Sequence, residues 1–343
     1  MSRQNPEDVI VGITMGDPSG IGPEVIVQAH ERIRQHVVPV VIGDEPVLEA
    51  AIDVCEADVG LQRIDTPTEA TAVDRSVLPL LDLANVSDHR WGVVDAAFGR
   101  ASLAYVERAI ELALEGAIDA IVTAPINKQA TRAAGSEHAG HTGLLAARTN
   151  TERYSMMLIA HGLRVTHVST HVPLREACAL VETDRVVETI HVTHGALREL
   201  GIDAPTIAVA GLNPHAGDDR LLGTEDADKI APAVAQVRDA EIDAVGPISP
   251  DTVYVRAAAG EFDCVVSMYH DQGHIPIKML GFSAGEAVSG VNVTIGLPIV
   301  RTSVDHGTAF DIAGQGVADA TSMVDAVEVA ARLVGVRRGG SDR

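Results

Sequence analysis

Short apolar segments rich in β-branched residues alternate along the chain with longer segments of helical periodicity. Residues 9–15 (VIVGITM) precede a helical segment at 22–35, and residues 119–125 (DAIVTAP) follow a longer one at 93–116. Parallel strands joined by crossover helices produce this alternation, because each return to the same end of a sheet needs a connection of helix length. The pattern therefore predicts an α/β protein.

The remaining elements extend this pattern to the end of the chain. Strands are predicted at 164–170, 206–212, 263–269 and 291–296, and a closing helix at 319–337. At about 150 residues per domain, a chain of 343 residues has the length of two domains. No linker rich in Pro, Gly or Ser marks a flexible boundary, so we expect two domains to share strands or helices.

The charge balance excludes some classes of partner. A net charge of -22 repels nucleic acid and anionic membranes, so we expect neither as a partner. Of the 26 basic residues only three are lysines, Lys128, Lys229 and Lys278. A carboxylate-rich, lysine-poor surface suits a cytoplasm of high salt, and ordinary compositional bias is the open alternative.

The location follows from what the chain lacks. No apolar run approaches the roughly 20 residues that span a bilayer, and the first residues, MSRQNPED, lack the apolar stretch of a signal peptide. We therefore expect a cytoplasmic protein. Cys55, Cys178 and Cys264 fit neither a disulfide framework nor a C-x-x-C site, so we expect three buried, reduced thiols.

Three of the fourteen histidines, His171, His215 and His270, occupy equivalent places just after predicted strands. In open α/β sheets ligands bind beyond the carboxyl ends of the strands, so these imidazoles could converge. Three imidazoles and one open position are typical of catalytic zinc, and such a set favours zinc, cobalt or nickel over magnesium. Loop histidines that only form hydrogen bonds are the alternative. His167 is expected to lie in the core or behind the ligands.

Residues 269–278 (YHDQGHIPIK) place two imidazoles, a carboxylate, an amide and a lysine after a predicted strand, with Gly273 and Pro276 as interruptions. Such polar density is costly unless it meets a ligand. Lysine can release a proton when its pKa is lowered, whereas arginine cannot. We therefore predict a chemical role for Lys278, with an exposed ion-pairing lysine as the alternative there and at Lys128.

Two further segments could contact an anion. Residues 16–24 (GDPSGIGPE) link the first strand to a helix, and a phosphate cradle and a tight structural turn are both open readings. In residues 297–314, Arg301 can bind a carboxylate or phosphate through two parallel hydrogen bonds. Asp311 could accept hydrogen bonds from ribose hydroxyls or cap the following helix.

Eight motifs in order between residues 12 and 314 resemble the PdxA family, the 4-hydroxythreonine-4-phosphate dehydrogenases of pyridoxal phosphate biosynthesis. They are GITMGDPSGIGPE, TAPINK, GHTGLLA, STHVPL, GLNPHAG, GPISPDT, YHDQGHIPIK and VNVTIGLPIVRTSVDHGTAFDIAG. The resemblance implies a homodimer with a shared active site and a two-lobed α/β/α fold like that of isocitrate and isopropylmalate dehydrogenases. Residues 1–150 plus 290–343 would form the cofactor lobe, and residues 151–289 the metal and dimer lobe.

The resemblance also implies the site residues. The metal ligands fall on His171, His215 and His270, which agrees with the strand-end argument. NAD, with NADP as the alternative, would lie near Gly307 and Asp311. The substrate-binding residues would be His141, Thr142, Lys278, Asn292 and Arg301.

The chain departs from the biosynthetic members at one place. It carries MLGFSAGEAVSG between Lys278 and Val291, and His274 where leucine is usual. Both features resemble a sister branch that acts on 4-phospho-D-threonate or 4-phospho-D-erythronate.

The implied reaction is oxidation at C3 by NAD followed by decarboxylation. It converts 4-phosphooxy-L-threonine to 3-amino-2-oxopropyl phosphate and CO2, or, in the sister branch, yields dihydroxyacetone phosphate. A divalent metal, zinc ahead of cobalt, nickel and magnesium, would polarise the C3 oxygen. Lys278 would protonate the enolate, and Asp251 would be the base or an orienting carboxylate. A zinc phosphoesterase and a phospho-metabolite sensor are alternatives of other classes, and neither would produce NADH.

Overall fold

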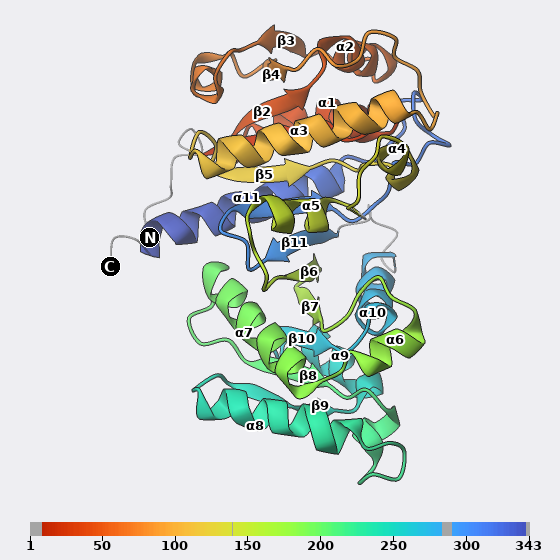
Figure 1. The fold of residues 1–343 in the computed structure, drawn as a ribbon. Helices are drawn as coiled ribbons and strands as arrows, with labels where there is room; N and C mark the ends of the chain where they lie inside the picture. The colour runs from red at the N-terminus through yellow and green to blue at the C-terminus, as the bar shows by residue number, and fades with distance from the viewer. Residues whose placement is uncertain (1–8, 139, 283–289, 341–343) are drawn as a thin grey trace. The chain divides into compact units, whose positions relative to one another are not determined.

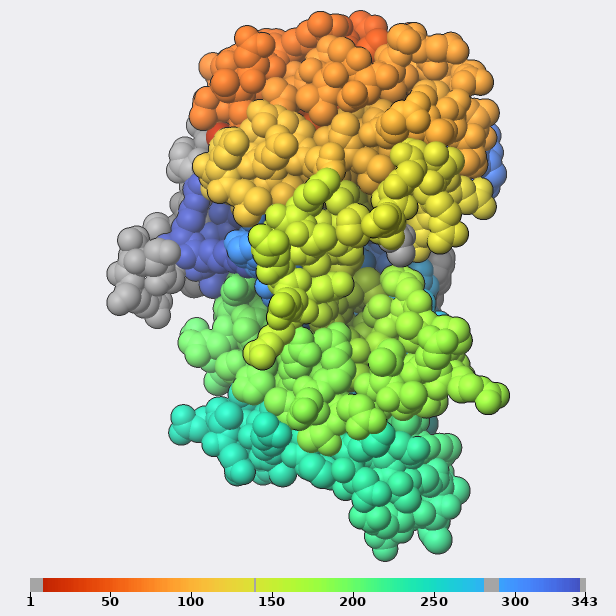
Figure 2. Space-filling view, viewed as in Figure 1, coloured from red at the N-terminus to blue at the C-terminus, as the bar shows by residue number. Residues whose placement is uncertain are grey.

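The computed structural model describes residues 9–138, 140–282 and 290–340. These residues form two compact units (Figure 1). The first unit lies within residues 1–151 and 297–343, and the second within residues 152–296. In each unit the strands and the inner faces of the helices are lined with buried apolar side chains, and Figure 2 shows the outer surface from the same side as Figure 1.

The strands of the first unit are all parallel, as the sequence predicts. Their order is β3-β4-β2-β1-β5-β12. Strands such as β2 and β5 are buried along their whole length, which is typical of a parallel sheet covered on both faces. The strand bounds are β1 Ile10–Thr14, β2 Val38–Gly43, β3 Gly60–Arg63, β4 Val77–Asp82, β5 Ala120–Thr123 and β12 Val300–Val304.

Helices cover the two faces of this sheet. Helix α3 packs on β1, β2 and β5, while α11 packs on β12 and β5 and also contacts α1 (Figure 1). The carboxylate of Asp95 caps α3 by accepting a hydrogen bond from Ala97 N at 2.8 Å. The predicted helices at 22–35, 93–116 and 319–337 are thereby confirmed. The helix bounds are α1 Gly22–Ile33, α2 Glu45–Val54, α3 Ala96–Leu114, α4 Lys128–Ala133, α5 His141–Arg148 and α11 Thr321–Gly340, with a 3-10 turn at Pro67–Ala72.

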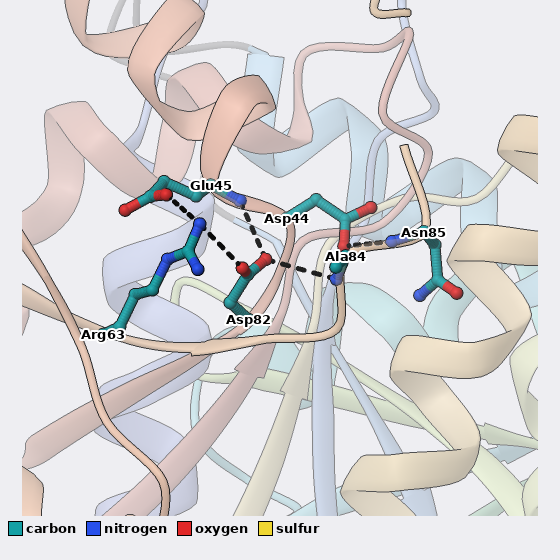
Figure 3. Close-up of polar contacts among 6 residues, drawn as sticks. All are labelled: Asp44, Glu45, Arg63, Asp82, Ala84 and Asn85. Carbon is teal, nitrogen blue, oxygen red and sulfur yellow. Dashed lines mark hydrogen bonds and ion pairs between the residues drawn. The ribbon is translucent and has the colours of Figure 1, made fainter. Parts of the chain in front are cut away.

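A polar cluster closes the carboxyl ends of β2 and β4 (Figure 3). Asp82 pairs with Arg63 and accepts backbone hydrogen bonds. Asp44 accepts from Asn85 N at 2.9 Å and, through its other oxygen, from the hydroxyl of Tyr105 at 2.6 Å. Every oxygen of both carboxylates has a partner within the protein, so this cluster stabilises the loop after β4.

The second unit contains one reversed strand that the sequence analysis did not predict. Its strand order is β11-β6-β7-β10-β8-β9, and β6 runs antiparallel to both β11 and β7. Only His161 and Gly162 join β6 to β7, and both have positive φ values, +47° and +85°. Two left-handed residues form a tight hairpin turn, which cannot make a crossover. The expectation of parallel strands throughout is therefore wrong for β6.

The other strands of this unit run parallel to one another; β7, β8, β10 and β11 lie where the sequence predicts strands, whereas β9 was not predicted. Their bounds, with that of β6, are β6 Ser155–Ala160, β7 Leu163–His167, β8 Ile207–Ala210, β9 Ala244–Ile248, β10 Cys264–Ser267 and β11 Val291–Ile295. Helices α7 and α8 contact each other on one face, and α9 and α10 pack on the strands with a shared apolar core (Figure 1). The helix bounds are α6 Leu174–Ala179, α7 Thr183–Glu199, α8 Ala231–Asp239, α9 Pro250–Ala258 and α10 His270–Phe282, with a 3-10 turn η3 at Pro214–Gly217 and a π-helical turn η4 at Asp226–Ile230.

Helix α10 runs through both residues that we expected to interrupt it. Pro276 lies inside the helix. A Cβ on Gly273 would lie 2.5 Å from both His167 Nε2 and Val165 Cγ1, so only glycine lets the helix approach β7 so closely. None of the described helices is long and apolar enough to cross a membrane.

Candidate active site

The sheet of the second unit brings the three predicted metal ligands to the same edge. Strands β7, β10 and β8 are neighbours and parallel, so their carboxyl ends coincide. His171 follows β7, His270 begins α10 directly after β10, and His215 lies in η3 after β8. This placement is the one that the strand-end argument predicts.

The rings themselves are only partly brought together. The ring centroids of His171 and His270 are 5.6 Å apart, and His270 Nδ1 lies 2.7 Å from Asp271 Oδ1, which orients that ring. His215 acts electrostatically on Asp251, whose pKa it helps to lower. Within the described ranges no three His, Cys, Asp or Glu side chains lie close enough to coordinate one ion. The metal assignment therefore stays a prediction.

His215 lies in an unusual loop. All six residues 215–220 have positive φ, and five of them are not glycine. Each such residue costs about 1–2 kcal/mol, so the conformation persists only where its surroundings impose it. The buried carboxylate of Asp226 does so at the start of the loop, because it accepts hydrogen bonds from Leu212 N at 2.8 Å and Asn213 N at 3.1 Å. The sequence analysis missed Asp226, since nothing local ties it to a segment 13 residues away.

Helix α10 presents a stripe of ionisable side chains. His270, His274 and Lys278 are four residues apart and so lie along one helix face. The rings of His270 and His274 are stacked, 3.6 Å apart with an angle of 11° between them. Burial, and then the neighbouring His270, lower the pKa of His274 to about 4, which keeps it neutral at pH 7.

His167 lies behind this stripe. Its side chain is 1% exposed and its ring centroid is 4.8 Å from that of His274. Burial, reinforced by His274, lowers the pKa of His167 to about 3. The uncharged ring packs between β7 and α10 and lies against Gly273.

Two other predicted residues of the second unit lie on separate elements. Asn292, half-buried on β11, donates to Met156 Sδ at 2.9 Å, and its Oδ1 is buried without a hydrogen bond from the described residues. Asp251 is exposed in the first turn of α9. The hydroxyl of Ser249 donates to Asp251 at 2.5 Å and is the main reason why the pKa of that carboxyl is lowered.

In the first unit, Arg301 and His141 are near enough to interact electrostatically. Arg301, on β12, is 2% exposed and donates to Thr123 Oγ1 at 2.6 Å. Burial lowers the pKa of Arg301 to about 9. His141 and Thr142 form the amino end of α5, and burial, followed by the charge of Arg301, holds the pKa of His141 well below its usual value. A buried cation and a helix amino end together favour a bound anion.

The predicted cofactor residues lie in the loop between β12 and α11. Gly307 has open space around its α-carbon, and Asp311 is exposed. Nε2 of the neighbouring His306 is buried and makes no hydrogen bond within the described ranges. The capping alternative for Asp311 is wrong, because α11 begins at Thr321, whose amide donates to Asp319 at 2.7 Å. An exposed carboxylate beside open backbone fits the ribose of a dinucleotide.

The cysteines differ from the expectation in part. Cys264 is buried and Cys55 is half-buried, but Cys178 is exposed on the short helix α6, so the prediction of three buried thiols is wrong there. Burial is the main cause that raises the pKa of Cys55 to about 11 and of Cys264 to about 12, so neither is an activated nucleophile.

The chain is similar over most of its length to one family of dehydrogenases. The family model described as "Pyridoxal phosphate biosynthetic protein PdxA" matches residues 35–330. The D-threonate 4-phosphate dehydrogenase of Cupriavidus necator is 47% identical over 328 residues, which are 94% of this chain and 97% of the relative. The 4-hydroxythreonine-4-phosphate dehydrogenase of Desulforapulum autotrophicum is 46% identical over 329 residues, 94% of each chain.

A solved structure agrees with the sequence comparison. The crystal structure of 4-hydroxythreonine-4-phosphate dehydrogenase from Klebsiella pneumoniae matches with a TM-score of 0.85 at 42% identity, covering 95% of this chain and 99% of that one. The α/β fold class predicted from the sequence is confirmed.

Proposed function

This chain belongs to the PdxA family, and from that membership we propose that it is an NAD-dependent dehydrogenase that oxidises and decarboxylates a 4-phosphorylated four-carbon hydroxy acid. NAD, when bound, would accept the hydride from C3 while a base takes the hydroxyl proton, and the product of this oxidation would be a β-keto acid. Loss of CO2 then forms an enolate, which takes up one proton.

The observation that carries this proposal is the anion-favouring site formed by Arg301 and the amino end of α5. A desolvated guanidinium binds a phosphate or carboxylate more strongly than an exposed one, because less water competes for it. His141 is held neutral by burial and by the neighbouring cation, so it can donate one hydrogen bond without adding charge. We assign Arg301, His141 and Thr142 to the anionic groups of the substrate.

The proton transfers fall to residues of the second unit. Lys278 is exposed on α10, and Asn292 is half-buried on β11. We propose that Lys278 gives the proton to the enolate and that Asn292 binds substrate. The Ser249 hydrogen bond makes Asp251 less basic, which supports its role as an orienting carboxylate for His215 over its role as the general base.

For the cofactor, we propose that NAD binds along the loop that contains Gly307 and Asp311. The exposed carboxylate of Asp311 suits a ribose 2′-hydroxyl and would repel the 2′-phosphate of NADP, which supports NAD. We retain His171, His215 and His270 as proposed ligands of a divalent metal, zinc first. Because three ligands do not meet within the described ranges, no step of the reaction is assigned to that metal.

A second substrate has one observation in its favour. His274, 7% exposed, lies between His270 and Lys278 on one face of α10, so a change there alters the surroundings of two proposed site residues. This supports 4-phospho-D-threonate or 4-phospho-D-erythronate as the alternative to 4-phosphooxy-L-threonine. The longer segment after Lys278 lies largely outside the described residues.

We also propose a homodimer. Ile275 and Met279 are 57% and 63% exposed and lie four residues apart on α10, while Leu174 of α6 is 61% exposed. Large apolar side chains at this exposure are typical of a surface that is buried on association. Sedimentation of wild type and of Met279→Glu tests this, since a dimer that the charge does not weaken would exclude this face.

The decisive experiment follows NADH absorbance with NAD or NADP and each of the three phosphorylated acids. NADH and CO2 formed in equal amounts support the dehydrogenase, whereas phosphate released without NAD would indicate a phosphoesterase. His215→Ala should lose bound metal and activity together while it remains folded. Full activity in a metal-free sample would exclude the metal part of the proposal and leave the rest intact.

A further inference from the structure

The glycine-rich segment 16–24 contacts the predicted cofactor loop, residues 305–316, and does not form an open phosphate cradle. The amides of Ser19 and Gly20 both donate to Asp17. The amide of Ile21 donates to Thr308 O at 3.0 Å, and a Cβ on Gly20 would lie 2.9 Å from that same oxygen. These amides are therefore occupied within the protein, and the segment supports the loop.

Two side chains of α1 hold the far end of the same loop. Glu24, 0% exposed, accepts from Gly314 N at 2.7 Å through Oε1 and from Gly316 N at 2.8 Å through Oε2. Gln28, four residues further on and on the same helix face, donates to Gly316 O at 2.9 Å. Both backbone polar groups of Gly316 are thus bound by one face of α1.

The loop is also closely packed where Glu24 holds it. Gly314 and Gly316 have φ values of +81° and +68°. A Cβ would lie 2.6 Å from Trp91 at Gly314, and 2.3 Å from Val54 O at Gly316. Hydrogen bonds to a buried carboxylate are stronger than neutral ones, so the backbone at both glycines is fixed by contact and by charge.

We propose that Glu24 is a positioning residue for dinucleotide binding. Asp311 lies within a stretch that is held at Thr308 by the glycine-rich segment and at Gly314 and Gly316 by Glu24, and Gly307 directly precedes Thr308. A loop restrained at both ends keeps its ligand-binding groups in place, which lowers the entropy lost on binding. The inference rests on the proposed function, because it takes this loop as the cofactor loop.

The test compares Glu24→Gln with a matched control, Asp119→Asn. Asp119 accepts a hydrogen bond at 2.8 Å from the amide of Ile10, the first residue of β1, and forms an ion pair with Arg338. The control therefore also replaces a hydrogen-bonded carboxylate by an amide, but at the amino ends of the strands. In the Gln variant the side-chain –NH2, which is a donor, faces one of the two backbone N–H groups, so one of the two hydrogen bonds of Glu24 is lost. We expect the Kd and KM for NAD to rise about tenfold or more, while kcat and the KM for the phosphorylated substrate stay within about twofold.

Two further readouts do not depend on activity. Amide hydrogen exchange at Gly314 and Gly316 should accelerate in Glu24→Gln and not in Asp119→Asn. Trp91, the single tryptophan of the chain and a neighbour of Gly314, reports NAD binding by its fluorescence. If Glu24→Gln does not fold, Gln28→Ala decides, because it removes the hydrogen bond to Gly316 O while Glu24 stays in place, and it should raise the Kd for NAD by a smaller factor.

The outcomes separate the two proposals. A folded Glu24→Gln variant that binds NAD as tightly as wild type would overturn the role of Glu24 and leave the proposed dehydrogenase intact. If Glu24→Gln does not fold, a Gln28→Ala variant with wild-type affinity for NAD would have the same meaning. A wild-type protein that does not bind NAD would overturn the proposed cofactor and this inference together. An equal loss of affinity in Asp119→Asn would show a general effect of destabilisation and would also overturn the inference.

Discussion

The rings of His270 and His274 stack face to face, with 3.6 Å between their centroids. His270 is a proposed metal ligand, so a change at residue 274 acts directly on the ring that would bind the ion. Because the two rings stack, the side chain at position 274 also lies next to the proposed substrate site.

Replacing His274 with leucine, the residue usual in biosynthetic members, should shift substrate preference. We expect kcat/KM for 4-phosphooxy-L-threonine relative to 4-phospho-D-threonate to rise about tenfold, because one altered pocket contact is worth about that factor. Steady-state kinetics with both acids measure the ratio. His191→Leu, at an exposed position of α7, is the control and should leave it unchanged.

Replacing Lys278 with arginine should keep the KM for substrate within about tenfold and remove most of kcat. Arginine retains the positive charge but does not release a proton near neutral pH. Lys229→Arg is the control, since Lys229 forms an ion pair with Glu182 at 2.6 Å away from α10. If Lys278→Arg turned over at the wild-type rate, Lys278 would only bind an anion.

Asp17 should make the protein less stable as the pH rises from about 4 to about 6. Burial raises the pKa of Asp17 from 3.8 to about 6, so the folded state holds a proton that the unfolded state has released in this window. The free energy of unfolding therefore falls by up to about 3 kcal/mol between about pH 4 and about pH 6 and is constant above that range. Denaturant titrations of wild type and Asp17→Asn should diverge across it, and a difference independent of pH would contradict this.

Replacing Gly273 with alanine should destabilise the second unit by about 1–3 kcal/mol, because the new Cβ overlaps His167 and Val165. Lys278 and His270 should move with α10, so kcat should fall as well. The control is Gly195→Ala in α7, where nothing lies within 4 Å of a Cβ. Helix propensity predicts that this variant gains up to about 1 kcal/mol, and thermal melts of both proteins measure the contrast.

Salt should stabilise the protein if its acidity is an adaptation to high salt. With 48 acidic and 26 basic residues the chain repels itself at low ionic strength. In molar KCl the Debye length is about 3 Å, which screens most of this repulsion. We expect Tm and dimer content to rise steeply from about 0.1 to about 2 M KCl, while the KM for the phosphorylated substrate also rises. A dimer already fully stable in dilute buffer would indicate compositional bias instead.

The sequence by itself determined the α/β class, the positions of β1, β5, β7, β8, β10 and β11, and the places where histidines follow three of these strands. These properties are local, since hydrophobic periodicity and the residue after a strand are read within about ten positions. The hairpin turn at His161 and Gly162 is marked locally by the glycine, but histidine is a weak indicator of the left-handed conformation that this turn needs.

Only the tertiary structure decided which groups meet. Glu24 reaches Gly314 and Gly316 across 290 residues, and Asp226 holds the loop of His215 from another turn. Stacking of His274 on His270 needs α10 to continue through Pro276, and that helix depends on close packing of Gly273 against β7. Such contacts depend on the packing of elements far apart in sequence, and no local pattern encodes which buried carboxylate will find which backbone amide.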